Sequence, residues 1–132
     1  MKVVALDYGS ARTGVAVSDP TGMIARPLGV VERAASEAGL ARLAELVRDE
    51  AAERVVVGLP LTLRGERGAQ AQETEAFVEA LRAVVGVPVE SYDERFTTGL
   101  AANVGSDDAP EDARAAAHLL SSYLAWSSAG RE

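Results

Sequence analysis

The spacing of apolar residues changes in a fixed order along this chain, and that order limits the folds open to it. Residues 3–6 form an unbroken apolar run, as in a strand buried on both faces. A second strand begins at Val15, directly after Gly14, and residues 23–31 fit a third strand bent at Pro27. Because the links between these three strands are short, we expect them to form an antiparallel meander.

After residue 35 the apolar residues take helical spacing, which two further strands interrupt. Residues 36–53 contain the first expected helix, with Ser36 as its N-cap. A strand at residues 55–57 is expected to stop at Gly58 and Pro60. The remaining elements are a helix marked by Phe77, Leu81, Val84 and Val85, a strand at residues 87–92, and a last helix marked by Leu119, Leu120, Tyr123 and Leu124.

These elements follow the order β-β-β-α-β-α-β-α. Helices join the later strands, so the first, fourth and fifth strands are expected to run parallel, with right-handed crossovers that stack the fourth and fifth beside the first. The predicted fold is α/β: a mixed five-stranded sheet flanked by helices. A length of 132 residues suits one domain, so we expect residues 1–132 to form a single unit.

Composition excludes several classes of protein. The chain has no cysteine, which excludes catalytic thiols, zinc fingers and iron–sulfur clusters. It has no long apolar run, so neither a signal peptide nor a transmembrane span fits, and a cytoplasmic location without membrane contact is expected. The net charge of −7 argues against binding to nucleic acid through charge alone, because phosphate contacts come from Lys and Arg.

Two segments place acids at the ends of expected parallel strands, where open α/β sheets bind ligands. Asp7 follows the first apolar run and opens the segment Asp7-Tyr8-Gly9-Ser10-Ala11-Arg12-Thr13-Gly14. Its glycines let the backbone approach a phosphate, and Arg12 is able to pair with one. An ordinary hairpin also uses such glycines but has no need for Asp7. Asp93 and Glu94 follow the fifth strand, where the start of a helix is the alternative interpretation.

Asp112 is a third candidate acid. Helical spacing puts it on the face of the last helix that carries Leu119 and Tyr123 and points at the sheet, although acids are also common in a first helical turn. Three carboxylates at one place repel each other unless a cation lies between them, and all-oxygen ligands suit Mg²⁺ or Mn²⁺. Two such ions activate a water and stabilise the leaving oxygen of a phosphodiester. The residues by themselves therefore indicate metal-dependent phosphoryl chemistry.

Four motifs follow one another over nearly the whole chain. They are Asp7-x-Gly9-x-x-Arg12-x-Gly14-Val15-Ala16-Val17-Ser18-Asp19, then Val56-Val57-Gly58-Leu59-Pro60 with Gly65 and Gly68, then Asp93-Glu94-Arg95-Phe96-Thr97-Thr98, and finally Asp112-x-x-Ala115-Ala116 leading to Ser122-Tyr123-Leu124. Each motif is weak alone, but in this order they are specific. Together they resemble the YqgF/RuvX family, which has a ribonuclease H-like (Holliday-resolvase-like) fold.

The resemblance implies an endonuclease-type hydrolase, most often linked to processing of the 5′ end of pre-16S ribosomal RNA. It implies that Asp7, Glu94 and Asp112 hold the metal, and that Asp93, the alternative to Glu94, completes the catalytic acids. The expected substrate-binding residues are Gly9, Arg12, Arg64, Arg67, Arg95, Thr97 and Thr98.

One departure from the family concerns the segment before Asp112. Family members usually carry a longer, basic segment here, whereas residues 105–111 of this chain are short and acidic. A phosphate-contacting surface is therefore expected to be reduced. This departure bears on substrate affinity and not on the metal site.

Three other functions remain open at this point. A resolvase of four-way DNA junctions uses the same chemistry, so structured RNA and branched DNA are both candidate partners. The sequence also leaves open whether the protein forms a homodimer. A non-catalytic nucleic-acid-binding module fits if the acids hold no metal. The segment from Asp7 to Gly14 also resembles the first phosphate loop of actin-like ATPases and sugar kinases, which need a second domain that 132 residues cannot supply.

Trp126 is the only tryptophan in the chain and has two interpretations. Its ring is able to stack on a nucleobase. Its place near the end of the last helix favours a role in closing the core.

Overall fold

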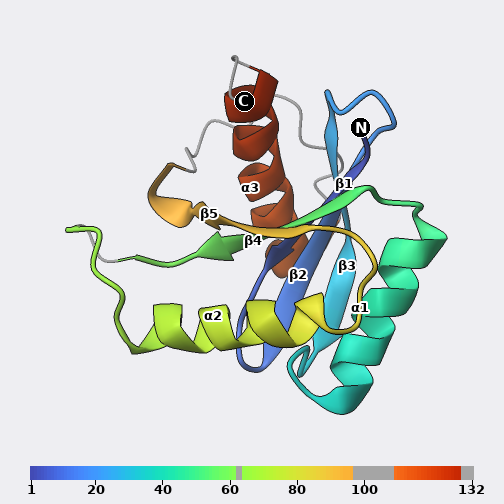
Figure 1. The fold of residues 1–132 in the computed structure, drawn as a ribbon. Coiled ribbons are helices and arrows are strands. Elements are labelled where there is room, and N and C mark those ends of the chain that lie inside the picture. Colours follow the sequence, from blue (N-terminus) through green and yellow to red (C-terminus); the bar gives the residue numbers. More distant parts are fainter. Residues whose placement is uncertain (62–63, 97–108, 129–132) are drawn as a thin grey trace.

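The computed structural model describes residues 1–61, 64–96 and 109–128, which form a five-stranded sheet with helices on both faces (Figure 1). In chain order the elements are β1 (Val3–Asp7), β2 (Arg12–Ser18), β3 (Ala25–Glu32), α1 (Glu37–Asp49), β4 (Arg54–Leu59), α2 (Ala69–Arg82), β5 (Val89–Asp93), the 3-10 helix η1 (Glu94–Phe96) and α3 (Glu111–Ser128). The strand order across the sheet is β3-β2-β1-β4-β5. The first three strands are antiparallel, and β4 and β5 run parallel to β1. The expected mixed sheet and its element order are confirmed.

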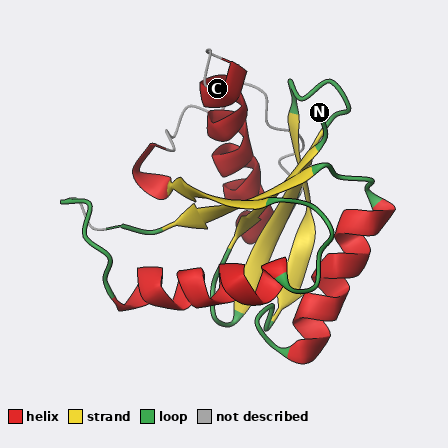
Figure 2. Ribbon diagram, viewed as in Figure 1, coloured by secondary structure: helices red, strands yellow, loops and turns green. Residues whose placement is uncertain are grey.

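Helices α1 and α2 cover one face of the sheet, and α3 covers the other (Figure 2). Successive residues of a strand point to opposite faces. In β1, Val4 and Leu6 pack on the side of α1 and α2, whereas Val3 and Ala5 pack on the side of α3. This alternation places the next residue, Asp7, on the α3 side.

Helix α1 lies within the expected range and has the expected cap. The side-chain oxygen of Ser36 accepts a hydrogen bond from the backbone N–H of Gly39 at 3.0 Å, which satisfies one of the free donors at the helix start. Glu37 in the first turn and Arg48 in the last complement the helix dipole. The cap and the charges together explain why the helix forms at this place.

Several expected boundaries are wrong, including those of β3, expected at 23–31, and of β5, expected at 87–92, and three more bear on glycines or on the helix face. β2 begins at Arg12, so Gly14 lies inside a strand, where it pairs with Asp7. β4 does not stop at Gly58, because this residue pairs with Tyr92 in the parallel ladder and the strand runs to Leu59. Helix α2 ends before Val84, whose side chain is 42% exposed and so adds nothing to the buried helix face. Both strand glycines make room for neighbouring groups, as shown below.

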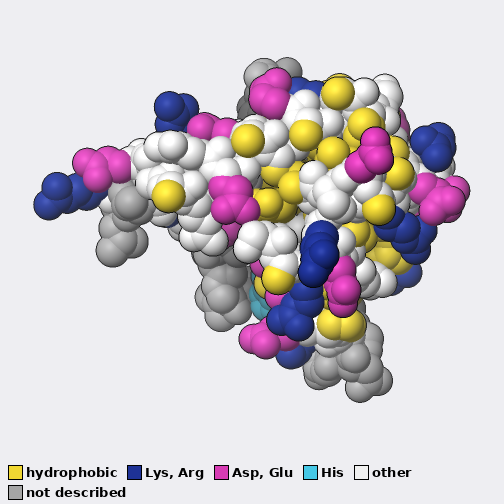
Figure 3. Space-filling view, turned by 90° about the horizontal axis from the view of Figure 1, so that it is seen from below, with side chains coloured by type: hydrophobic (Ala, Val, Ile, Leu, Met, Phe, Trp, Pro, Cys, Tyr) yellow, Lys and Arg dark blue, Asp and Glu magenta, His cyan; other side chains and the backbone are white. Residues whose placement is uncertain are grey.

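Charged and apolar groups are mixed on the surface. On the face seen in Figure 3, arginines and acids lie among the hydrophobic side chains, without segregating by sign. Among the described residues, no helix combines the length and the apolar character needed to cross a membrane.

Candidate active site

Asp7 and Glu94 come together at the carboxyl ends of β1 and β5. Asp7 is the last residue of β1, and Glu94 is the first residue after β5, in η1. Their side chains are close enough to shift each other's pKa, and both are partly buried. The next residue along, Tyr8, points to the opposite face, where its ring stacks on Phe77 of α2 at 4.4 Å between ring centroids. The alternation of the strand therefore delivers Asp7, and not its neighbour, to the α3 side.

The two carboxyl groups resist ionisation. Burial raises the pKa of Asp7, and the charge of Asp112 raises it further, although the hydrogen bond to Glu94 lowers it. Burial also raises the pKa of Glu94, followed by the charge of Asp7 and the hydrogen bond between the two side chains. Two acids of like charge, partly removed from water, are stabilised by a proton or a cation between them.

Gly58 leaves the space that Glu94 occupies. A β-carbon at residue 58 would lie 2.9 Å from Oε2 of Glu94 and 3.1 Å from a methyl carbon of Leu119. Sequence reasoning treated this glycine as a strand stop and missed its role beside the acid. A glycine inside an apolar strand, which often marks a close approach by another group, was the signal available.

Gly14 lets the first turn of α3 approach the sheet. A β-carbon at residue 14 would lie 1.8 Å from the backbone oxygen of Asp112, so no other residue fits without moving the helix. Gly14 pairs directly with Asp7 across the β1–β2 ladder. The close approach therefore brings the start of α3, with Asp112, near Asp7.

The Asp112 carboxylate forms an ion pair with Arg12. Nε of Arg12 lies 3.1 Å from Oδ2 of Asp112, and the two side chains are 64% and 37% exposed. Arg12 was expected to bind a phosphate, and here it binds the third acid. An exposed pair of this kind contributes about 0–1 kcal/mol, so a stronger ligand can separate it.

Asp93 is held by Arg95, although its charge also adds to the raised pKa of Glu94. It is the last residue of β5, and its carboxylate accepts hydrogen bonds from the backbone and side chain of Arg95. The hydrogen bond from the Arg95 side chain holds the pKa of Asp93 below its usual value. Asp93 thus has a cation beside it, whereas the charges around Asp7 and Glu94 include further acids.

The donor chemistry fits a divalent cation, but the geometry supplies two ligands together rather than three. Within residues 1–61, 64–96 and 109–128, no group of three acidic or histidine side chains surrounds one point. Asp7 and Glu94 supply adjacent oxygen donors of the kind that Mg²⁺ and Mn²⁺ prefer. The carboxylate of Asp112 is paired with Arg12 instead.

The other expected substrate-binding residues divide into three groups. Arg95 and the loop before α2 lie close together, since a β-carbon at Gly65 would be 3.3 Å from the Arg95 guanidinium. In the same loop Arg64 is exposed, and Arg67 pairs with Glu75 at 3.1 Å. Gly9 lies in the tight link between β1 and β2, where a β-carbon would be 2.6 Å from the backbone oxygen of Arg12. Thr97 and Thr98 lie outside the described residues.

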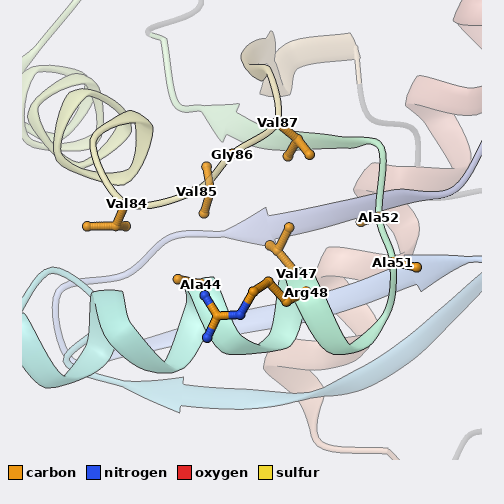
Figure 4. Close-up of a pocket in the computed structure, with 9 residues that line it drawn as sticks. All are labelled: Ala44, Val47, Arg48, Ala51, Ala52, Val84, Val85, Gly86 and Val87. Carbon is orange, nitrogen blue, oxygen red and sulfur yellow. The ribbon is translucent and has the colours of Figure 1, made fainter.

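A hollow of about 310 Å³ lies on the opposite face of the sheet, away from the acids (Figure 4). It is lined by aliphatic side chains and Arg48, from the last turns of α1 and from residues 84–87. No acidic residue lines it. The hollow therefore offers none of the oxygen ligands that a metal-dependent reaction needs.

A family model and individual relatives place this chain in the same family. Residues 1–126 match the RuvX family, described as Holliday junction resolvase. A protein of Desulforudis audaxviator named "Putative pre-16S rRNA nuclease" is 39% identical over 139 aligned positions, which cover 99% of both chains. A protein of Chloroflexus aggregans with the same name is 48% identical over 96 residues, which cover 73% of this chain and 68% of that relative.

Solved structures confirm the fold. RuvC of T. thermophilus, determined in complex with a Holliday junction substrate, superposes with a TM-score of 0.72 at 20% sequence identity. The superposition covers 98% of this chain and 96% of that one, and it bears out the expected ribonuclease H-like fold. With a family match over residues 1–126 and a full-length relative at 39% identity, the chain belongs to the RuvX family.

Proposed function

We propose that this protein is a metal-dependent endonuclease that hydrolyses phosphodiester bonds in precursor 16S ribosomal RNA. Family membership and the names of its relatives support nuclease activity. The observation that carries the chemistry is the contact between Asp7 and Glu94, two partly buried acids with raised pKa values at the ends of parallel strands. A cytoplasmic location belongs to the same proposal, because precursor ribosomal RNA would be met there.

Asp7 and Glu94 would hold Mg²⁺ or Mn²⁺, and Asp112 would join them. A bound ion of this kind, or a pair of them, polarises the phosphoryl group and activates a water. The contribution of the chain is to fix the acids: β1 ends at Asp7, Gly58 leaves room for Glu94, and Gly14 admits the helix that carries Asp112. Glu94 rather than Asp93 is the ligand in this proposal, because Arg95 holds the Asp93 carboxylate.

The arginines would bind the phosphate backbone on either side of the acids. Arg12 is exposed, so a substrate phosphate can replace Asp112 as its partner. The exchange would free Asp112 to complete the ligand set when substrate arrives. Arg95, next to Glu94 in η1, and the exposed Arg64 in the loop beside Arg95 would supply further positive charge.

The proposal is tested with three substrates offered side by side. The purified protein is incubated with the 5′ precursor region of 16S ribosomal RNA, an unstructured RNA of equal length, and a four-way DNA junction, in Mg²⁺, in Mn²⁺ and in EDTA. We expect cleavage of the precursor RNA in either metal and none in EDTA. Cleavage in EDTA would contradict the metal mechanism.

The same assay separates the alternatives. The family description as Holliday junction resolvase favours a second candidate, and cleavage of the junction alone would replace the RNA proposal with that one. Tight binding without cleavage of any substrate in either metal would indicate a binding module. ATP hydrolysis without nucleic acid would point to the phosphate-loop chemistry of actin-like ATPases.

A further inference from the structure

Four of the six aromatic residues of the chain gather where β5, η1 and α3 meet. Tyr92 lies at the centre and is 5% exposed. Its ring centroid is 6.1 Å from that of Phe96, 5.6 Å from Tyr123 and 5.4 Å from Trp126. The remaining pair, Tyr8 and Phe77, stacks on the other side of the sheet, at the α2 face.

Two rings of this cluster face solvent. Phe96 is 56% exposed and Trp126 is 40% exposed, whereas Tyr123 is fully buried. Of the large apolar residues that are exposed in the described part of the chain, these are the aromatic ones, and both contact Tyr92. Trp126 therefore packs against the core rings, as its place in the helix favours, and leaves part of its own ring exposed.

Hydrogen bonds hold Phe96 in place although its ring is not buried. Oγ of Ser122 in α3 donates to the backbone oxygen of Phe96 at 2.8 Å. The same Oγ lies 3.0 Å from the hydroxyl of Tyr92. Ser122 thus ties η1 to α3 and fixes where the exposed ring lies, which is a pre-organised arrangement of the kind that lowers the entropy lost on binding.

The cluster is continuous with the candidate active site. Phe96 and Glu94 belong to the same three-residue η1, and Arg95 lies between them. On α3, Ser122 lies one helical turn after Leu119, whose side chain borders the space beside Glu94. A substrate strand bound at the acids would pass these rings next on that side.

We propose that Phe96 and Trp126 form a stacking platform for unpaired nucleobases of the substrate. The inference rests on the proposed nuclease function and adds to it that the strand beside the cleavage site is single-stranded. Aromatic side chains stack on bases of any sequence, and this interaction does not need a basic surface. That property suits a chain with a net charge of −7 and a short acidic segment at residues 105–111. Bases in an intact duplex are already stacked on each other and do not offer a free face.

Trp126 is its own probe, because it is the only tryptophan in the chain. The wild-type protein in EDTA, where no cleavage is expected, is titrated with a short single-stranded RNA while tryptophan fluorescence is followed. Two matched ligands are titrated in parallel: the same sequence as a full duplex, and an abasic strand of equal length that keeps the phosphates. We expect strong quenching by the first and little by the other two.

Affinity of a labelled strand, followed by fluorescence anisotropy, tests each ring. Phe96→Leu and Trp126→Leu should each weaken binding of the single strand about 5- to 140-fold, with little change for the abasic strand. Val84→Ala, which trims an exposed apolar side chain outside the site, is the control and should bind as wild type does. Thermal melts of all variants verify that each is folded, and the two rings provide independent variants if one is not.

The outcomes distinguish this inference from the proposed function. Equal quenching by the abasic strand, or unchanged affinity in both leucine variants, overturns the platform even where the wild-type protein cleaves RNA. Quenching and weakened binding without cleavage of any substrate support the platform and contradict the nuclease proposal.

Discussion

On the α3 face of the sheet, charged side chains are arranged differently at the two ends of the parallel strands. Opposite charges are paired at the amino end, whereas acids lie together at the carboxyl end. At the amino end, Arg54 lies 3.4 Å from Glu90 and donates a hydrogen bond to the hydroxyl of Tyr123 at 2.9 Å. That hydroxyl in turn donates to Glu90 at 3.0 Å, and its bond with Arg54 raises the pKa of the guanidinium. At the carboxyl end, Asp7 and Glu94 meet each other, and Asp112 adds a third negative charge.

This difference separates a structural network from a candidate functional one. In the Arg54 network, partly buried charges of opposite sign are paired and share hydrogen bonds with Tyr123, so none of them needs a further ligand. Burial raises the pKa values of Asp7 and Glu94, the charge of Asp112 adds to the first and that of Asp7 to the second, and ionised acids in such surroundings lower the stability of the metal-free protein. Such crowding is typical of sites where a ligand supplies the missing charge. We therefore expect substitutions at the two ends to affect different properties.

The largest effect on activity without loss of an acid is expected from Gly58→Ala. The new methyl group would lie 2.9 Å from Oε2 of Glu94, so the acid must move while the flexible end of its side chain keeps the cost in stability small. We expect cleavage to fall about 10- to 100-fold, as when a group that orients a metal ligand is changed. Initial cleavage rates of the precursor RNA in Mg²⁺ measure this. Gly29→Ala, whose β-carbon would meet nothing within 4 Å, is the matched control and should keep wild-type rates.

At the other end, Tyr123→Phe should change stability and leave cleavage unaffected. The substitution keeps the ring but removes the hydroxyl that joins Arg54 and Glu90. The expected loss is about 1–2 kcal/mol, because buried polar groups lose a shared partner. Thermal unfolding should show Tm lower by about 4–8 °C. A large loss of cleavage with an unchanged Tm would mean that the network at the amino ends of the parallel strands takes part in activity.

The smallest effect concerns pH. The pKa values of Asp7 and Glu94 are raised in the folded protein, so the folded state binds protons more tightly than the unfolded chain. Stability of the metal-free protein should therefore fall as pH rises from about 4 through these raised pKa values. Asp7→Asn removes one of the repelling charges and should stabilise the protein at pH 7 by on the order of 1 kcal/mol.

The higher stability of Asp7→Asn over the wild-type protein should shrink as pH falls toward 4, where the wild-type acids hold a proton. Thermal melts of both proteins in EDTA across this pH range measure the difference. For Asp93 the dependence of stability on pH has the opposite sign. Its pKa is lowered by Arg95, so its contribution to stability is present at neutral pH and is lost as pH falls below its unfolded pKa. Asp93→Asn should therefore bring no gain at pH 7, and a gain equal to that of Asp7→Asn would show that the crowding is not specific to the acidic pair.

The sequence was sufficient to predict the sheet, because the switch from continuous apolar runs to helical spacing follows from local periodicity. It also singled out Asp7 as a candidate, since an ordinary hairpin has no need for an acid directly after a buried strand. It did not separate Asp93 from Glu94. The predicted strand ended one residue short of Asp93, and a shift of one residue reverses the face of every side chain in a strand.

Contacts between distant parts of the chain were beyond the reach of local patterns. Gly14 and Asp112 are about a hundred positions apart, and only the docking of α3 on β2 shows that the glycine serves a close approach and not a turn. The same docking produces the ion pair of Arg12 with Asp112. Arg12 was recognised as a functional candidate, but its partner depended on tertiary packing.

The central claim is that Asp7 and Glu94, and not Asp93, hold the metal ion. Calorimetric titration of Mn²⁺ into the wild-type protein, Asp7→Asn, Glu94→Gln and Asp93→Asn tests it most directly, because it needs no substrate. We expect Asp7→Asn and Glu94→Gln to bind Mn²⁺ at least about tenfold more weakly than the wild-type protein, while Asp93→Asn stays within about threefold. Wild-type affinity in Glu94→Gln together with lost affinity in Asp93→Asn would contradict it.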